Sequence, residues 1–172
     1  KEPATTHGCK DATLDAAKLQ RLFSQPCNLG IATGHGLVVL DIDKKAADGE
    51  LTLQTWEAEH TPLPRTYTVK TPSGGTHYYF STTKKCGNKV ALGPGVDVRG
   101  EGGYVVAPPS ALLVGGSYTV LDASPLAPIP AWLLEKISTP TPKKPLKSGV
   151  IPQGSQDDEL HKLACSLARQ GL

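Results

Sequence analysis

The sequence lacks several patterns that define large classes of protein. No stretch of 18 consecutive residues is apolar, so the sequence predicts no membrane-spanning helix. No Gly-x-x-x-x-Gly-Lys segment occurs, so the residues given encode no P-loop for ATP hydrolysis. The cysteines include no Cys-x-x-Cys pair, and their spacing does not build a zinc site. They are Cys9, Cys27, Cys86 and Cys165. Dispersed cysteines without a signal peptide predict reduced thiols and a cytoplasmic protein.

An excess of one charge is also missing. The chain has 18 lysines and arginines against 16 aspartates and glutamates, a net charge of +2 over 172 residues. A strongly basic nucleic-acid-binding face would leave a larger excess, so we expect any such binding to be modest and salt-sensitive. The basic cluster of Lys84, Lys85 and Lys89 either contacts template phosphates or is solvated.

The first motif present is an apolar strand that ends in two aspartates, residues 37–43. Side chains alternate between the faces of a strand, so Asp41 and Asp43 are expected on one face and the apolar residues in the core. Two neighbouring carboxylates repel each other unless a cation lies between them. A divalent cation with oxygen ligands is the usual solution. The alternative is an exposed strand end with two solvated aspartates.

The second motif is a turn followed by a strand, residues 71–80. The turn contains Ser73, Gly74 and Gly75, and glycines let an anion approach backbone N–H groups that can bind phosphate. His77 lies on the strand that follows, on the same face as Tyr79. The alternative is a hairpin turn followed by a half-buried histidine, and the residues alone suit both readings equally.

The third motif is a short strand, residues 96–99, between two glycine-rich breaks. Alternation places Asp97 and Arg99 on one face. An arginine beside a metal-binding carboxylate suits phosphate, because its guanidinium is a rigid fork of donors. The alternative is a surface ion pair that contributes little to stability.

Together the three motifs resemble the bifunctional primase–polymerase (prim-pol) domain of the archaeo-eukaryotic primase superfamily. That family carries an apolar strand ending in Asp-x-Asp or Asp-x-Glu, a serine-containing loop ending in histidine, and a strand with a further aspartate. Here these are Asp41 with Asp43, Ser73 through His77, and Asp97. The flanking segments 28–34 and 96–110 also resemble the prim-pol branch, and the resemblance covers roughly residues 1–135.

The resemblance implies a DNA primase and DNA polymerase that transfers nucleotides by a two-metal mechanism. Asp41, Asp43 and Asp97 would be catalytic and would hold two Mg²⁺ or Mn²⁺ ions. The incoming triphosphate would be bound by His77, Ser73, Arg99, Gly74 and Gly75, with Lys70 as an added contact. The implied partners are a DNA template and primer, (d)NTPs and a helicase domain further along the chain. The implied setting is the replication of a phage, plasmid or mobile element.

The pattern of elements predicts an α/β fold with helices packed on a mixed, mainly antiparallel sheet, like the modified RNA-recognition fold of that family. Thr13 is expected to cap a helix that ends near Phe23, with Leu19, Leu22 and Phe23 inward. Further helices are expected at 50–59 and 130–134, and strands at 29–33, 37–43, 66–71, 76–81, 95–99, 103–107 and 117–121. The predicted domains are a catalytic domain (1–137), a proline-rich linker (138–154) and the start of an accessory helical region (155–172), which we expect to be truncated.

Two other readings stay open. A phosphatase or phosphotransferase of the haloacid dehalogenase type also has an apolar strand ending in Asp-x-Asp, but it needs a paired acidic motif on strand ends. The Asp157–Asp158 pair lies in the tail and fits this poorly. The second reading is a catalytically silent nucleic-acid-binding module. Three carboxylates on facing strands argue against it, because burying charge is costly without a function that requires it.

Overall fold

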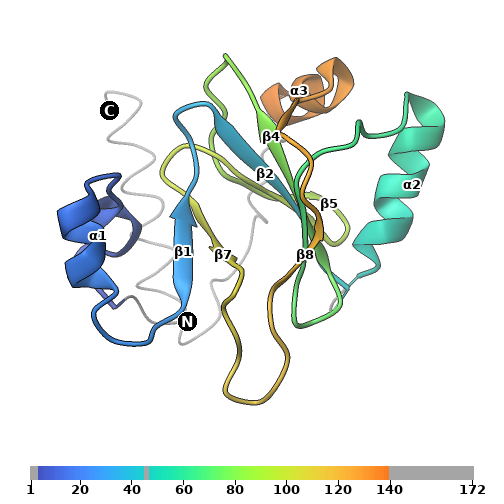
Figure 1. The fold of residues 1–172 in the computed structure, drawn as a ribbon. Coiled ribbons are helices and arrows are strands. Elements are labelled where there is room, and N and C mark those ends of the chain that lie inside the picture. The colour runs from blue at the N-terminus through green and yellow to red at the C-terminus, as the bar shows by residue number, and fades with distance from the viewer. Residues whose placement is uncertain (1–3, 45–46, 140–172) are drawn as a thin grey trace, which may run out of the picture. The chain divides into compact units, whose positions relative to one another are not determined.

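The computed structural model describes residues 4–44 and 47–139 (Figure 1). In chain order the elements are η1 (Gly8–Asp11), α1 (Ala16–Leu22), β1 (Leu29–Ala32), β2 (Leu37–Ile42), α2 (Gly49–Glu59), β3 (Thr68–Lys70), β4 (Thr76–Ser81), β5 (Lys89–Gly93), β6 (Val96–Arg99), β7 (Tyr104–Ala107), β8 (Thr119–Asp122), β9 (Ala127–Pro128) and α3 (Ala131–Ser138). The predicted α/β class with a mainly antiparallel sheet is confirmed. Among the described helices, none combines the length and apolar character that crossing a bilayer demands.

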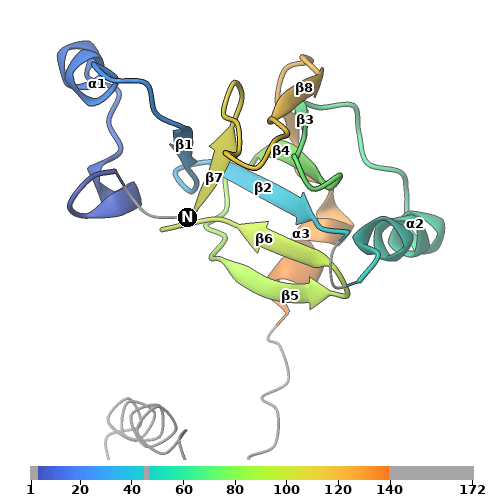
Figure 2. The same ribbon diagram turned by 90° about the horizontal axis from the view of Figure 1, so that it is seen from below.

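The main sheet has the strand order β5-β6-β2-β4-β3-β8, and all of these neighbours are antiparallel. Strand β9 adds a short parallel pairing to the end of β4. Strands β1 and β7 form a separate antiparallel ribbon. Figure 2 shows β2 running between β6 and β4, so both of its edges are hydrogen-bonded inside the sheet.

One face of the sheet is covered by helices. The β2 residues on this face, Val38, Leu40 and Ile42, are at most 2% exposed and pack with Leu53 of α2 and Leu133 of α3. Figure 2 shows α3 behind β6. The expected alternation along β2 is therefore present, with its apolar side chains in the core.

The other face is only partly covered. Val39 of β2 packs with Tyr79 of β4 and with Val105 of β7, so the β1–β7 ribbon closes this part of the sheet. Two residues further along the same strand, Asp41 lines an open cavity. The sheet therefore buries one end of this face and leaves the end that carries the acidic residues open to solvent.

Helix α1 differs from the prediction. It begins at Ala16 and is capped by Asp15, whose side chain accepts a hydrogen bond from the Lys18 N–H. Thr13 instead accepts from the Asp15 N–H and stabilises the preceding turn. Leu22 and Phe23 are 40% and 43% exposed, and no α1 residue is buried, because this seven-residue helix lies beside the β1–β7 ribbon rather than on the main sheet (Figure 1).

Strand β5 is absent from the predicted strands, which pass from residues 76–81 to 95–99. Its first residue, Lys89, does not have either of the two roles expected for it. Its ammonium group donates to the carbonyls of Lys136 at 3.3 Å and Ile137 at 3.2 Å, in the last turn of α3, and also to Thr139. A cation is favourable there because the carbonyls at the end of a helix lack partners within it. The register shift in β5 interrupts the alternation of its side chains, which explains why no strand was predicted there.

The other predicted helices and strands lie within a few residues of the observed elements, whereas η1 and β9 were not predicted. The predicted linker 138–154 and accessory region 155–172 lie outside the described residues, apart from Ser138 and Thr139. Their boundaries with the catalytic domain stay predictions.

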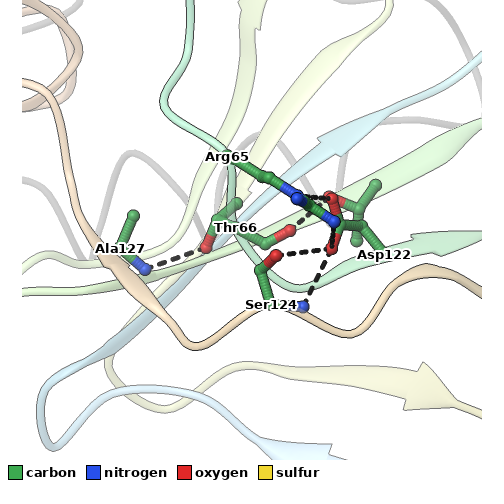
Figure 3. A network of polar contacts seen from close by, with 6 residues as sticks. Arg65, Thr66, Asp122, Ser124 and Ala127 are labelled. Carbon is green, nitrogen blue, oxygen red and sulfur yellow. Dashed lines mark hydrogen bonds and ion pairs between the residues drawn. The ribbon is translucent and has the colours of Figure 1, made fainter.

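A polar network fixes the end of β8 against the segment before β3 (Figure 3). Asp122 accepts hydrogen bonds from Arg65 Nε at 2.7 Å and from the hydroxyl and N–H of Ser124 at 2.6 and 2.9 Å. Nearby, the Ala127 N–H donates to the Thr66 hydroxyl at 3.0 Å. The Arg65 and Ser124 hydrogen bonds hold the pKa of the Asp122 carboxyl well below its usual range.

This pKa shift predicts a pH-dependent contribution to stability. Because the folded-state pKa is lowered, the contribution is complete above the unfolded value of about 4 and is lost as the pH falls below it. Asp122→Asn should therefore lower the free energy of unfolding at pH 6, and its deficit should shrink at pH 3. Urea denaturation of both proteins at the two pH values measures this. An equal deficit at both pH values would show that the charge of Asp122 is not what the network uses.

Candidate active site

The antiparallel register brings three predicted site residues into one row. Asp41 of β2 lies directly opposite His77 of β4 and directly opposite Asp97 of β6. Directly opposed residues in antiparallel strands point to the same face, with Cβ atoms about 5 Å apart. The row lies on the face opposite the helices, where Asp41 and Asp97 are partly exposed and His77 is buried.

The guanidinium of Arg99 lies between the two aspartates of this row. Its Nη2 atom is 2.7 Å from Asp97 Oδ2 and 3.8 Å from Asp41 Oδ2. The three side chains are 25–30% exposed. One cation therefore partly neutralises both carboxylates, which lets them lie on neighbouring strands without strong repulsion.

Asp97 is also held by the backbone of β5. The Ala91 N–H donates to Asp97 Oδ1 at 2.8 Å, and Ala91 has a positive φ of 54° at the irregular part of β5. Arg99 takes the other oxygen, so both oxygens of Asp97 have a fixed partner. Our sequence reasoning missed the role of Ala91, and no side-chain pattern signals it because the contact is made by the backbone.

Asp43 lies where the end of β2 meets α2 and β6. Its N–H donates to the Gly95 carbonyl at 2.8 Å, and its carbonyl accepts from the Gly49 N–H at 3.0 Å. A Cβ on Gly49 would lie 2.1 Å from the Gly95 oxygen, so this close approach requires a glycine. The Asp43 carboxylate accepts a hydrogen bond from the Lys44 N–H at 2.7 Å.

An open cavity of about 670 Å³ joins these residues. Its polar lining comes from Asp41, Asp43, Asp97 and Arg99, and the rest comes from Ala47 and from Ala91, Gly93, Pro94 and Gly95. Residues Lys70, Ser73, Gly74, Gly75 and His77 do not line it. The structure thus gathers the three predicted metal ligands and Arg99 at one cavity, and places the other predicted nucleotide contacts outside its wall.

His77 is a buried residue. It is 5% exposed, and its Nε2 atom is 3.4 Å from Asp41 Oδ1. The Nδ1 atom has no hydrogen-bond partner among residues 4–44 and 47–139, and the rings of Tyr79 and Tyr118 lie 6.3 and 5.8 Å away between centroids. The imidazole therefore contacts the other site residues through its Nε2 atom, which faces Asp41.

The loop between β3 and β4 carries the remaining predicted contacts. Gly75 meets the end of β2 closely, because a Cβ there would lie 2.2 Å from the Ile42 oxygen. Ser73 shares a hydrogen bond of 3.1 Å with the Thr71 hydroxyl, whereas a Cβ on Gly74 would meet nothing within 4 Å. Lys70, just before the loop, is exposed. The loop therefore lies on the β4 side of the β2 end, and the cavity lies on the β6 side.

The donor set fits a hard divalent cation in its chemistry. Three carboxylates on one cavity wall supply the oxygen ligands that Mg²⁺ and Mn²⁺ prefer. As placed, no three acidic, histidine or cysteine side chains of the described part of the chain converge on one point. Arg99 lies between Asp41 and Asp97 instead, so holding an ion between them requires the guanidinium to move.

The fold is a mixed α+β domain whose mainly antiparallel sheet carries three aspartates and an arginine around one open cavity. The family described as bifunctional DNA primase/polymerase, N-terminal, matches residues 1–132, and this chain belongs to that family. No curated protein matches the sequence. Membership confirms the resemblance expected from the three motifs, supports a primase/polymerase role in DNA replication, and implies DNA and nucleotide substrates.

Proposed function

We propose that this domain is a metal-dependent nucleotidyltransferase that adds (d)NTPs to the 3′-hydroxyl of a primer on a DNA template. The observation that supports this most is the shared cavity of Asp41, Asp43 and Asp97 beside Arg99, in a chain of the primase/polymerase family. A phosphatase of the haloacid dehalogenase type has no support from the family match.

The three aspartates are proposed to hold two divalent ions. When bound, such ions stabilise the developing charge on the attacking and leaving oxygens of the phosphoryl transfer. Asp41 and Asp97 are suited to this because they lie on neighbouring strands of a rigid sheet, and the Ala91 N–H holds one oxygen of Asp97 in place. Asp43 adds a third carboxylate at the strand end.

Arg99 is proposed to exchange partners. In the structure its guanidinium pairs with the carboxylates that are proposed to bind metal. With metal bound to those carboxylates, the guanidinium of Arg99 would be free to bind the triphosphate of the incoming nucleotide through its fork of donors. Arg99 thus serves as an internal counterion first and as a phosphate ligand afterwards.

The loop before β4 is proposed to supply the remaining triphosphate contacts. Ser73 offers an exposed hydroxyl, Gly74 leaves open space at the turn, Gly75 lets the loop approach the end of β2, and Lys70 adds a charge. His77 is proposed to contact the nucleotide through Nε2, because Nδ1 is buried. The downstream helicase, the cytoplasmic setting and the mobile-element host stay predictions.

Primer extension tests the proposal. A labelled primer on a template with a 5′ overhang is incubated with the protein, dNTPs or NTPs, and Mg²⁺, Mn²⁺ or EDTA. We expect products that follow the template sequence in the presence of a metal and none in EDTA. Release of inorganic phosphate without extension would indicate a phosphatase, and DNA binding without extension under any condition would indicate a catalytically silent module.

A further inference from the structure

We infer that the loop from Ser110 to Tyr118, here called the 110–118 hairpin, contacts nucleobases of the unpaired template strand. The inference goes beyond the metal and triphosphate site, and it rests on the proposed function only in that DNA binds beside this site. In Figure 1 the hairpin is the gold loop that connects β7 to β8 and extends beyond the ends of those strands.

The tip of the hairpin is aliphatic and exposed. Leu113 is 108% exposed, Val114 is 93% exposed and Leu112 is 37% exposed. Segment 110–118 contains no charged residue. Adjacent aliphatic side chains held in water are unfavourable, and a cluster of them on a surface commonly marks a contact site.

The tip is held on an ordered turn. The Leu112 N–H donates to the Gly116 carbonyl at 2.9 Å, and the Gly115 N–H donates back to the Leu112 carbonyl at 3.1 Å. Below the turn, Ala111 exchanges two hydrogen bonds with the Asn28 side chain, at 2.9 and 3.0 Å. The exposed residues are therefore presented from a hydrogen-bonded stem, which reduces the entropy lost when they bind a partner.

The stem is continuous with the candidate active site. Tyr118 is 6% exposed, and its ring lies 5.8 Å from the ring of His77, which faces Asp41. On the same leg, Gly116 lies against Pro72, because a Cβ there would be 3.0 Å from the Pro72 Cβ atom. The hairpin thus borders both the buried histidine and the loop before β4.

The uncharged, aliphatic tip is better suited to contact nucleobases than phosphates. Binding to a nucleic-acid backbone requires cations, and the hairpin has none. Nucleobases present flat apolar faces when they are unpaired, and aliphatic side chains of DNA-binding proteins insert between base steps. The exposed Lys70, proposed above as a triphosphate contact, lies beside the stem, because its strand neighbour is Thr119, the residue after Tyr118.

The test compares the full chain with the double variant Leu113→Ser/Val114→Ser. Leu14→Ser is the matched control, because Leu14 is 98% exposed and precedes α1. Affinity for a primer–template is measured by fluorescence anisotropy in EDTA without nucleotide, over a range of salt. We expect about a tenfold loss for the double variant, as two aliphatic contacts are removed, and no loss for the control. The slope of the logarithm of DNA affinity against the logarithm of salt concentration should be the same in both proteins, because the phosphate contacts remain.

A second readout locates the contact. 2-Aminopurine placed in the single-stranded template next to the primer end should change fluorescence on binding of the wild-type chain, and the double variant should remove most of this change. Equal DNA affinity and an equal signal in wild type and double variant would overturn the inference. A loss of self-association or of binding to uncharged lipid vesicles, with DNA affinity intact, would also overturn it. Because no turnover is involved, failed primer extension would refute the proposed activity without affecting this result.

Discussion

Asparagine in place of Asp41 or Asp97 is expected to reduce nucleotide incorporation by roughly 10²–10³-fold, a loss typical of removing one group that stabilises developing charge. The replacement keeps the shape and one oxygen but removes the charge that a divalent ion requires. Both residues face the cavity and share Arg99, so the two variants should fail in the same way. Single-turnover primer extension at saturating nucleotide measures the effect.

The fold should survive both substitutions. Each aspartate is 25–27% exposed and pairs with an arginine that retains the other aspartate as a partner. Thermal unfolding in EDTA should therefore change little, since partly exposed ion pairs contribute little. Glu59→Gln is the control, because its side chain is 57% exposed on α2 and outside the cavity lining. Full incorporation by both aspartate variants would refute the proposed metal role.

Arg99→Gln is expected to change metal and nucleotide affinity in opposite directions. Without nucleotide, Mn²⁺ binding should strengthen several-fold, because the carboxylates lose the cation that competes for them. With metal present, affinity for a (d)NTP should fall by about 10–100-fold, the usual cost of a charged hydrogen-bond donor. Isothermal titration with Mn²⁺, and then with nucleotide, measures both quantities without any turnover.

Arg99→Lys separates charge from geometry. Lysine keeps the positive charge but not the planar fork, so it should restore competition with the metal more fully than it restores nucleotide affinity. Weaker Mn²⁺ binding by Arg99→Gln would contradict the partner exchange, because it would mean that Arg99 supports the metal ligands rather than competing with them.

Much of the site follows from the sequence because strand alternation is a strict geometric rule. The apolar residues of β2 predicted one buried face, and Asp41 had to lie on the other. The turn residues before His77 and the glycines around Asp97 marked where neighbouring strands begin. The register itself was not predictable, because the segments between β2, β4 and β6 are long and contain α2, β3 and β5. Only the structure shows Asp41 opposite both His77 and Asp97.

The misses also have physical reasons. The burial of His77 involves Tyr118, which is distant in sequence and whose ring lies 5.8 Å from the imidazole. Strand β5 was missed because its irregular pairing interrupts the alternation, and its lysine contacts the end of α3 rather than solvent. The prediction that α1 buries one face was wrong. Helical periodicity does not indicate which surface, if any, a short helix packs against.

The position of Arg99 between the two aspartates bears on whether the domain can fold without metal. A domain whose acidic residues required a metal to coexist would fold only where that metal is abundant, as small zinc domains do. Here the neutralising charge is encoded two residues from Asp97 on the same strand. Under the proposed function, the chain should therefore fold and be stored in a chelating medium, and bind metal ions later without refolding.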